Sequence, residues 1–453
     1  MHNSHNIFFD MSVFMSGVFV APFCLLLLSI AVLPLVASHF WEKNRNKAVI
    51  AFSLGFPVAL FFLYYDRDVL IRTFLEYGAF IGLLGALFII SGGIYIRGSF
   101  KGTPLVNTAF LGVGAILANI IGTTGASMLL IRPLIRANHH RHHKVHTIIF
   151  FIFIVSNCAG ILTPLGDPPL YLGFLKGVSF GWTARLFPQF LTVMIFLLSL
   201  YYFVDSYCFR KETVGHKTSG DEPVLSEHFG VEGRRNFIFL VLIAGVSLFS
   251  GYVLYHLPGP VLFGEPFGSV LSQVFQVFSF IVLAVMSYKV TSKKVHEKNH
   301  FSFAPISEVA ILFAGIFAAM IPALVLLETR GETLGVGSAW QFFWLTGALS
   351  SFLDNAPTYL TFTSLAKGVL NLTSDGLKEL MTHPVGMKYL AAISCGAVFM
   401  GANTYIGNGP NFMVKAISEH AKIKMPSFFG YMMWSVGILI PLFLLVTAVF
   451  FLR

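Results

Sequence analysis

One polar pattern occurs twice in this chain, about 240 residues apart, inside sequence that is otherwise apolar. The two copies are Leu117-Ala118-Asn119 with Gly160-x-x-Thr163-x-Leu165-Gly166-Asp167-Pro168-Pro169, and Leu353-Asp354-Asn355 with Gly401-x-x-Thr404-x-Ile406-Gly407-Asn408-Gly409-Pro410. Irregular backbone inside a bilayer leaves amide and carbonyl groups that lipid cannot satisfy, so it survives only where it is buried in protein or lines a cavity. Paired interruptions at corresponding points of two halves predict the substrate site of a membrane transporter.

The composition places the chain among membrane proteins. It has 453 residues, of which 56% are hydrophobic and 11% charged, whereas soluble proteins carry about 25% charged residues. Several windows reach the ~20 apolar residues that span a bilayer. We expect a multi-pass protein of the cell membrane, which is the inner membrane if the source is Gram-negative. The first window, 17–38, is expected to be a retained helix and not a signal peptide, because it is long and no basic segment precedes it.

Three further features limit the functional classes. The four cysteines fall in or beside apolar segments without metal-ligand spacing, which favours packing roles. The sequence has no P-loop motif, which disfavours an ATP-driven pump, and we expect neither an enzyme nor a resident cofactor. The net charge of +9 is interpreted as a topology signal and not as the sign of a nucleic-acid partner.

Ten full spans are expected, all of them helical. They are 17–38, 48–65, 70–96, 145–175, 186–209, 236–257, 267–288, 305–328, 387–420 and 427–452. Two more apolar stretches, 104–137 and 338–370, are interrupted in the middle. If each of these enters and leaves on one face, 21 of the 30 Lys and Arg residues fall on one side of the membrane. The positive-inside rule makes that side cytoplasmic, and both termini are then expected to be non-cytoplasmic.

This topology predicts an all-α fold of two inverted repeats, each with five transmembrane helices, a re-entrant hairpin and a broken helix. An odd number of spans per repeat forces the second repeat to be inverted relative to the first. Residues 210–235 are expected to be a plain cytoplasmic linker between the repeats. The first repeat is 1–209, with its hairpin at 104–137 and its broken helix at 145–175, and the second is 236–453, with the hairpin at 338–370 and the broken helix at 387–420.

The two motifs contain only two ionisable residues, Asp167 and Asp354, and ionisable residues inside a membrane are costly and usually functional. Pro168 and Pro169 remove amide donors beside Asp167. The freed carbonyls, the carboxylate and the hydroxyl of Thr163 are hard oxygen ligands that suit Na⁺ or H⁺. We therefore predict a Na⁺ site at Asp167, Thr163 and Asp354, although Asp354 could instead simply cap the helix that follows it.

Uncharged polar residues of the two motifs complete the predicted ion- or substrate-binding site. They are Asn119, Thr123, Thr124, Asn355, Asn403, Thr404 and Asn408. Asn408 occupies in the second copy the place of Asp167 in the first. The hydroxyls of Thr123 and Thr124 could line a site or could only permit close helix packing. The histidine-rich tract 139–146 is interpreted as a solvated turn, with a pH-sensing role or a structural metal as the alternatives.

These residues resemble a known superfamily. Asp-Asn-x-Pro at 354–357, Thr-Pro-Leu-Gly-Asp at 163–167 and Gly-x-Asn-x-x-Ile-Gly-Asn at 401–408 are similar to motifs of the ion transporter superfamily. The closest likeness is to NhaD-type sodium/proton antiporters and the citrate transporters related to them. The resemblance implies hairpins and broken helices that meet at mid-membrane to bind a cation, and a homodimer. Ala118 departs from the pattern, because antiporters of this type usually carry a hairpin Asp at that place.

Two functions are compared. In a cation (Na⁺)/proton antiporter that works by alternating access, Asp167 and Asp354 would exchange Na⁺ for a proton, and this is the function we expect. The alternative is a Na⁺- or H⁺-coupled symporter of citrate or a dicarboxylate, whose substrate oxygens would be held by helix N-termini. The sequence offers no interior Arg to pair with a carboxylate, which favours the antiporter. Transport of another anion and a non-transporting scaffold are weaker alternatives. The expected partners are small ions or a small carboxylate, and the lipid bilayer.

Overall fold

The computed structural model describes residues 18–41, 43–97, 101–215, 230–299, 301–372 and 377–452. Within these residues the protein is α-helical except for one two-stranded ribbon. Nine helices of the described part are long and apolar enough to cross a membrane, which confirms a polytopic membrane protein. The elements are α2 (Ala21–Val36), α3 (Ser38–Trp41), α4 (Asn44–Tyr65), α5 (Arg67–Gly92), β1 (Tyr95–Arg97), α6 (Pro104–Ala137), α7 (Val145–Ile154), η1 (Cys158–Ile161), α8 (Pro168–Leu175), η2 (Phe180–Leu186), α9 (Phe187–Gly215), β2 (Gly230–Glu232), α10 (Asn236–Tyr252), η3 (Leu254–His256), α11 (Phe267–Val290), α12 (Lys293–Lys298), α13 (Ala304–Arg330), η4 (Gly331–Leu334), α14 (Ala339–Ser350), α15 (Asn355–Val369), α16 (Lys378–Thr382), α17 (Pro384–Met400), η5 (Gly401–Asn403), α18 (Gly409–His420), α19 (Phe428–Val446) and η6 (Thr447–Phe451).

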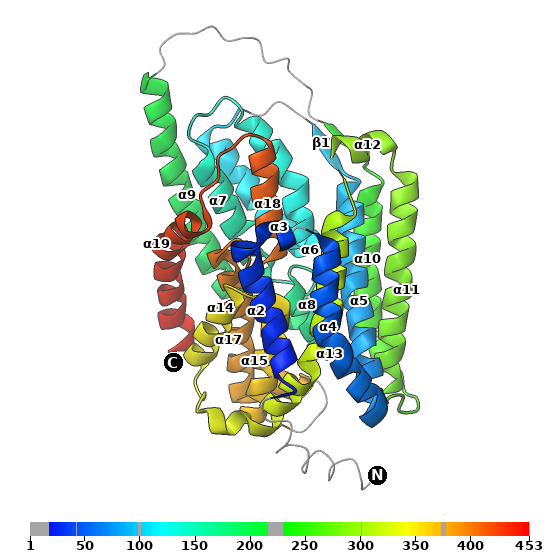
Figure 1. Ribbon diagram of the computed structural model, residues 1–453. Coiled ribbons are helices and arrows are strands. Elements are labelled where there is room, and N and C mark those ends of the chain that lie inside the picture. The colour runs from blue at the N-terminus through cyan, green and yellow to red at the C-terminus, as the bar shows by residue number, and fades with distance from the viewer. Residues whose placement is uncertain are drawn as a thin grey trace.

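The long helices form two outer groups with shorter segments between them (Figure 1). On the right of the view α13 packs on α4 and α5, and α11 packs on α5 and α10. On the left α14 packs on α17, and α9 packs on α7 and α19. The segments between them are α6, α8, α15 and α18. Of these, α6, α8 and α15 contact both groups; α15, for example, packs on α13 and on α17. Helix α18 packs on α6 and α7. Interrupted helices thus occupy the middle of the molecule.

Burial follows the same division. Every residue of α7 from Ile148 to Ile154 is buried, as expected for a short helix that is apolar on all sides. The outer helices instead expose large apolar side chains, such as Phe56 of α4, Val241 of α10 and Phe278 of α11. Extended apolar surface of this kind is typical of a membrane-facing perimeter.

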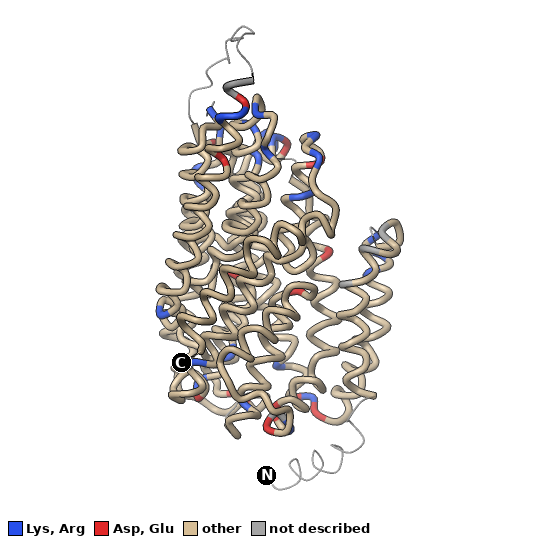
Figure 2. The backbone as a smooth tube through the Cα atoms, turned by 90° about the vertical axis from the view of Figure 1, so that its left-hand side faces the viewer, with Lys and Arg blue, Asp and Glu red and all other residues tan. Residues whose placement is uncertain are grey.

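Basic residues are concentrated at one end of the molecule's long axis. Figure 2 shows Lys and Arg gathered at the end that carries the β1–β2 ribbon, α12 and the loop 138–144. We call this the basic end. The C-terminus lies toward the other end (Figure 1), whereas the N-terminal residues fall outside the described part of the chain. By the positive-inside rule the basic end corresponds to the side predicted to be cytoplasmic.

The first interrupted stretch is the 34-residue helix α6, which has one break. Gly122 has φ +78° and ψ 156°, a combination that only glycine adopts readily. The first and last turns of α6 nevertheless meet. Asn107 Nδ2 donates to Asn138 Oδ1 at 2.9 Å, and Asn138 Nδ2 donates to Asn107 Oδ1 at 2.8 Å. Both ends of α6 therefore lie at the basic end.

The other three predicted interruptions are also places where helices end. The stretch 338–370 consists of α14 and α15, which are separated at residues 351–354. The segment 145–175 comprises α7, η1 and α8, and the segment 387–420 comprises α17, η5 and α18. In these last two segments a short irregular loop that contains a Thr and a Gly follows the 3-10 turn. The sequence pattern thus located the breaks to within a few residues.

The linker differs from the expectation of a plain connector over 210–235. Helix α9 continues to Gly215, and residues 230–232 form β2, which pairs with β1 antiparallel through Ile96 and Val231. Gly233, at φ +78°, turns the chain after β2, and Asn236 Nδ2 donates to Gly93 O at 2.8 Å. The strand is too short for its pairing to be recognised from sequence, because it depends on a partner more than 130 residues away. The middle of the predicted linker, 216–229, lies outside the described residues.

Candidate functional site

A buried carboxylate lies where the interrupted helices meet. Asp167 immediately precedes α8 and is 2% exposed. Its Oδ1 accepts hydrogen bonds from Thr123 Oγ1 at 2.7 Å and from Asn408 Nδ2 at 3.4 Å. Its Oδ2 accepts a hydrogen bond from Asn355 Nδ2. These donors belong to α6, to the residue that precedes α18, and to α15, so all four interrupted segments converge on this side chain.

Close backbone packing at glycines brings the segments together. A Cβ atom on Gly166 would lie 2.2 Å from Gly160 O, so the loop between η1 and α8 can close only with glycine at that place. The Thr123 amide, directly after the break at Gly122, donates to Gly166 O at 2.8 Å. The hydroxyl of Thr163 donates to Asn119 O at 2.5 Å. The broken helix is thus fixed to the break in α6, and the carbonyls of Asn119 and Gly166 are satisfied across the two breaks.

The second half repeats this geometry. The hydroxyl of Thr404 donates to Ser351 O, in the gap between α14 and α15. A Cβ atom on Gly407 would lie 2.7 Å from Gly401 O. Asn408 has φ −154° and ψ 139°, close to the values of −146° and 146° for Asp167. The two copies therefore have the same local backbone structure. They differ chemically because Asp167 carries a carboxylate where Asn408 carries an amide.

A network of asparagine side chains holds Asn408, one of the donors to Asp167, in place. Asn408 Nδ2 donates to Asn157 Oδ1 at 3.2 Å, and Asn157 Nδ2 donates to Asn411 Oδ1 at 2.6 Å. Asn411 Nδ2 in turn donates to the carbonyls of Gly401 and Thr404, both at 2.9 Å. The sequence analysis missed Asn157 and Asn411. The signal was present, because each is an amide in or beside an apolar run and close to a motif residue.

The site carries no compensating positive side chain. All three donors to Asp167 are neutral, and no ion pair to it occurs in the described part of the chain. Removing a carboxylate from water costs several kcal/mol after relaxation, and each hydrogen bond to a charged group returns about 1.5–3 kcal/mol. A proton or a bound cation would remove the remaining cost. The arrangement is therefore suited to bind and release one positive charge.

A small cavity adjoins the carboxylate. Its volume is about 60 Å³, and Thr123, Thr124 and Asp167 line one side of it. Apolar residues of α5 and α13, such as Leu87 and Val309, line the other side. Since a water-sized probe needs about 10–15 Å³, the cavity admits an ion and a few waters. A carboxylate as large as citrate requires the helices around it to separate.

The predicted site residues fall into three groups. The first group is Asp167 with the three residues that donate hydrogen bonds to its carboxylate, which are Thr123, Asn355 and Asn408. Asn119, Thr163 and Thr404 connect the breaks through backbone groups, and Thr124 lines the cavity. Asn403 and Asp354 have other partners. Asn403 Nδ2 donates to Ser351 Oγ at 2.9 Å, and the Asp354 carboxylate accepts from the Ala356 amide at 3.1 Å, which is a helix-capping contact at the start of α15.

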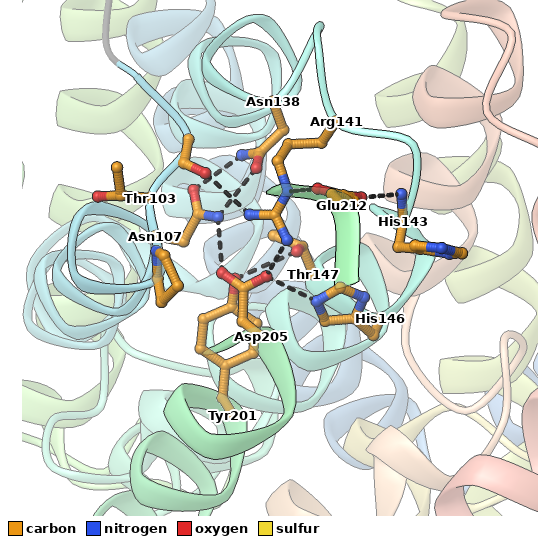
Figure 3. A network of polar contacts seen from close by, with 12 residues as sticks. Thr103, Asn107, Asn138, Arg141, His143, His146, Thr147, Tyr201, Asp205 and Glu212 are labelled. Carbon is orange, nitrogen blue, oxygen red and sulfur yellow. Dashed lines mark hydrogen bonds and ion pairs between the residues drawn. The ribbon is translucent and has the colours of Figure 1, made fainter. Parts of the chain in front are cut away.

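A second polar network lies at the basic end (Figure 3). Asp205 of α9 is fully buried and accepts from Arg141 Nη2 at 2.7 Å, from Asn107 Nδ2 at 3.0 Å and from Tyr201 OH at 3.1 Å. His146 Nε2 lies 2.9 Å from the same carboxylate. Because Asn107 also bonds to Asn138, the network joins both ends of α6 to α7 and α9.

The prediction that the histidine-rich tract 139–146 is a solvated turn is thus partly wrong. His139, His140, His142 and His143 are exposed, whereas His146 is buried in this network. Arg141 is buried as well. Burial lowers its pKa, but the hydrogen bond and the charge of Asp205 more than compensate, so the pKa of Arg141 is raised. In the described residues no cluster of three or more His, Cys, Asp or Glu side chains is placed to hold a metal ion.

Fold and site together define a polytopic membrane protein whose interrupted helices converge on a buried carboxylate, an arrangement typical of membrane transporters. Residues 13–451 match the model of a family described as "Putative citrate transport", and the chain belongs to that family. No curated protein matches the chain. The description of this family agrees with the resemblance to citrate transporters and does not mention sodium/proton antiport. It supports the symporter alternative better than the antiporter we expected.

Proposed function

We propose that the protein is a secondary transporter that couples a citrate-like carboxylate to the symport of a cation, Na⁺ or H⁺, bound at Asp167. The observation that carries the proposal is the Asp167 carboxylate, which is buried and, within the described residues, hydrogen-bonded only by neutral groups of the other interrupted segments. The family supplies the substrate class.

Charge repulsion provides the coupling. An anionic substrate that approaches within about 6 Å of an ionised Asp167 meets a repulsion of about 3 kcal/mol at an effective dielectric constant of about 20. This is a factor of more than about 100 in affinity. A cation or proton on Asp167 removes the repulsion, so the carboxylate binds only after the cation has bound. The two species then cross together.

Helix N-termini would hold the substrate. Helix α15 begins at Asn355, which contacts Asp167, and helix α18 begins at Gly409, next to Asn408, which also contacts Asp167. The N-terminus of a helix carries free amide donors and a partial positive charge, which favour an anion. The absence of an interior Arg from the motifs therefore does not exclude a carboxylate substrate.

The inverted repeats remain part of this proposal, and two observations support them. Helix α8 runs from Asp167 to Lys176, whose Nζ lies 2.9 Å from Glu76, in the half of α5 that is farther from β1 and the basic end. Helix α18 runs from Asn408 to His420 at the basic end. The two equivalent helices leave the site in opposite directions, as inverted repeats require. The contact between the ends of α6 supports a re-entrant hairpin that opens to the cytoplasm.

Uptake by proteoliposomes tests the proposal. Purified protein should accumulate radiolabelled citrate when an inward Na⁺ or H⁺ gradient is imposed, and an ionophore that collapses the effective gradient should abolish accumulation. The same vesicles loaded with a pH-sensitive dye test the antiporter. Na⁺-driven proton movement without any carboxylate flux would contradict symport and restore the antiporter.

Asp354 and Asn355 are expected to differ sharply although they are neighbours. Asp354→Asn should have a mild effect, because Asn caps a helix about as well as Asp and the capping contact to Ala356 is what its carboxylate makes. Asn355→Ala removes a donor to Asp167, and one hydrogen bond to a charged group is worth about 1.5–3 kcal/mol. A carboxylate with one donor fewer gains more from a bound cation, so the apparent affinity for the coupling cation should rise about 10- to 150-fold. Cation titrations of citrate uptake at two pH values measure both variants. If Asp354→Asn removes the cation or pH dependence, Asp354 also binds the coupling ion.

A further inference from the structure

A second, much larger cavity opens at the basic end. Its volume is about 660 Å³ and it lies between the end of α6, the end of α18, α12 and β1. Four of its lining residues are basic or can be protonated: Arg132, Arg136, Lys298 and His420. Among the described residues no Asp or Glu lines it. Its lining elements β1 and α12 belong to the basic end, where Figure 2 shows Lys and Arg residues gathered.

The two arginines carry uncompensated charge. In the described part of the chain neither Arg132 nor Arg136 forms an ion pair. Arg136 is held in place by hydrogen bonds to Tyr95 OH and to Ile96 O, and its guanidinium lies 4.8 Å from the centre of the Tyr95 ring. The Nε atom of Arg136 is buried without a hydrogen-bond partner. A guanidinium so fixed is prepared to recognise a carboxylate or a phosphate.

Two nearby carboxylates, Glu232 and Glu419, are already paired with lysines. Lys298 Nζ lies 2.7 Å and 2.9 Å from the two oxygens of Glu232, which does not line the cavity. Glu419, adjacent to His420 in sequence, is paired with Lys415 at 2.8 Å. The net charge facing the cavity is therefore positive, and it comes mainly from the two arginines.

Two helices lead from this cavity to Asp167. Thr123 and Arg132 both lie in the part of α6 that follows the break at Gly122. Helix α18 packs against α6, and it begins directly after Asn408 and contains Ile417 near its end. Nine helical residues separate the members of each pair, which corresponds to about 14 Å. The basic cavity and the carboxylate site are thus at opposite ends of the same two helices.

We propose that this cavity is a binding station for the transported polycarboxylate on the cytoplasmic side, with Arg132 and Arg136 as its principal contacts. The inference rests on the proposed function for the identity of the ligand. The shared chemistry is that of a multivalent anion, which an anionic lipid headgroup could also supply. A positive cavity of this kind raises the local concentration of an anion, whereas the deeper site, with its own carboxylate, repels it until a cation is bound.

Thiol protection tests the station directly and independently of transport. Ala421 lines the cavity and is exposed, so Ala421→Cys places a reporter there. The exposed Cys24 and the half-buried Cys208 are replaced by serine, and the other two cysteines are buried. The protein is reconstituted in nanodiscs of neutral phosphatidylcholine and modified with an uncharged maleimide, with citrate or with NaCl at equal ionic strength.

Citrate should slow the modification about tenfold at roughly ten times its Kd, because only the unoccupied fraction reacts. Arg132→Gln should restore the unprotected rate. Lys294→Gln, which removes an exposed charge of α12 outside the cavity, should leave the protection intact. Asp167→Asn should also leave it intact, which separates this station from the deeper site.

Three outcomes would overturn the inference: no protection by citrate, protection that survives Arg132→Gln, or protection only when phosphatidylglycerol replaces the neutral lipid. The last would assign the cavity to a lipid headgroup. Failure of citrate uptake with protection intact would refute the symporter and keep an anion site here. Uptake without protection would refute the station alone.

Discussion

Asp167→Asn is expected to abolish gradient-driven accumulation of citrate while the protein remains folded. Asparagine has nearly the same shape, and the hydroxyl of Thr123 and the amide of Asn355 can still bond to it. What disappears is the charge that binds the cation and repels the substrate. Neutralising a charge inside the membrane should not harm insertion. Accumulation should fall at least about 100-fold, in line with a coupling energy of about 3 kcal/mol.

Citrate binding separates loss of coupling from loss of the site. In the parent protein the apparent Kd for citrate should fall as the cation concentration rises, whereas in Asp167→Asn it should be independent of the cation. Asp68→Asn is the matched control, because Asp68 is an exposed carboxylate in the first turn of α5. Its transport and melting temperature should be unchanged. Concentrative uptake by Asp167→Asn on the cation gradient would exclude Asp167 as the coupling residue.

Most of the helices and all four interruptions could be predicted from the sequence, for a physical reason. Lipid leaves few options for a backbone inside a membrane, so Gly, Pro and polar residues within apolar runs mark where helices stop. The same constraint identified Asp167, Thr123, Asn355 and Asn408, since a polar side chain inside the membrane needs partners. The structure brings these four together.

Contacts between distant segments could not be predicted. Asp205 and Arg141 each look like ordinary residues near a helix end, and only their mutual approach makes them a buried pair. The β1–β2 ribbon depends on a similar long-range contact. Thr163 illustrates a different limit: the sequence marks its hydroxyl as polar, but the choice between a bound cation and Asn119 O is decided by the local path of the chain.

The buried pair of Arg141 and Asp205 is expected to contribute strongly to stability. Asp205→Asn removes the fully buried counter-charge of Arg141, in a site where the two side chains are 7% and 0% exposed, and leaves the guanidinium paired only with Glu212 among the described residues. Breaking a buried ion pair by removing one partner typically costs about 3–5 kcal/mol. The same substitution weakens the contacts to Asn107 and His146. Both ends of α6 should therefore loosen together with the start of α7.

Thermal unfolding in detergent and amide hydrogen exchange measure this effect. Asp205→Asn should lower the melting temperature markedly and reduce protection at both ends of α6 and around 138–147. The control is Glu419→Gln, which breaks an exposed i,i+4 pair with Lys415 at 2.8 Å, and exposed pairs contribute at most about 1 kcal/mol. Equal melting temperatures for the two variants would mean that water reaches Asp205 and screens its charge. The network at the basic end would then not hold the two ends of α6 together.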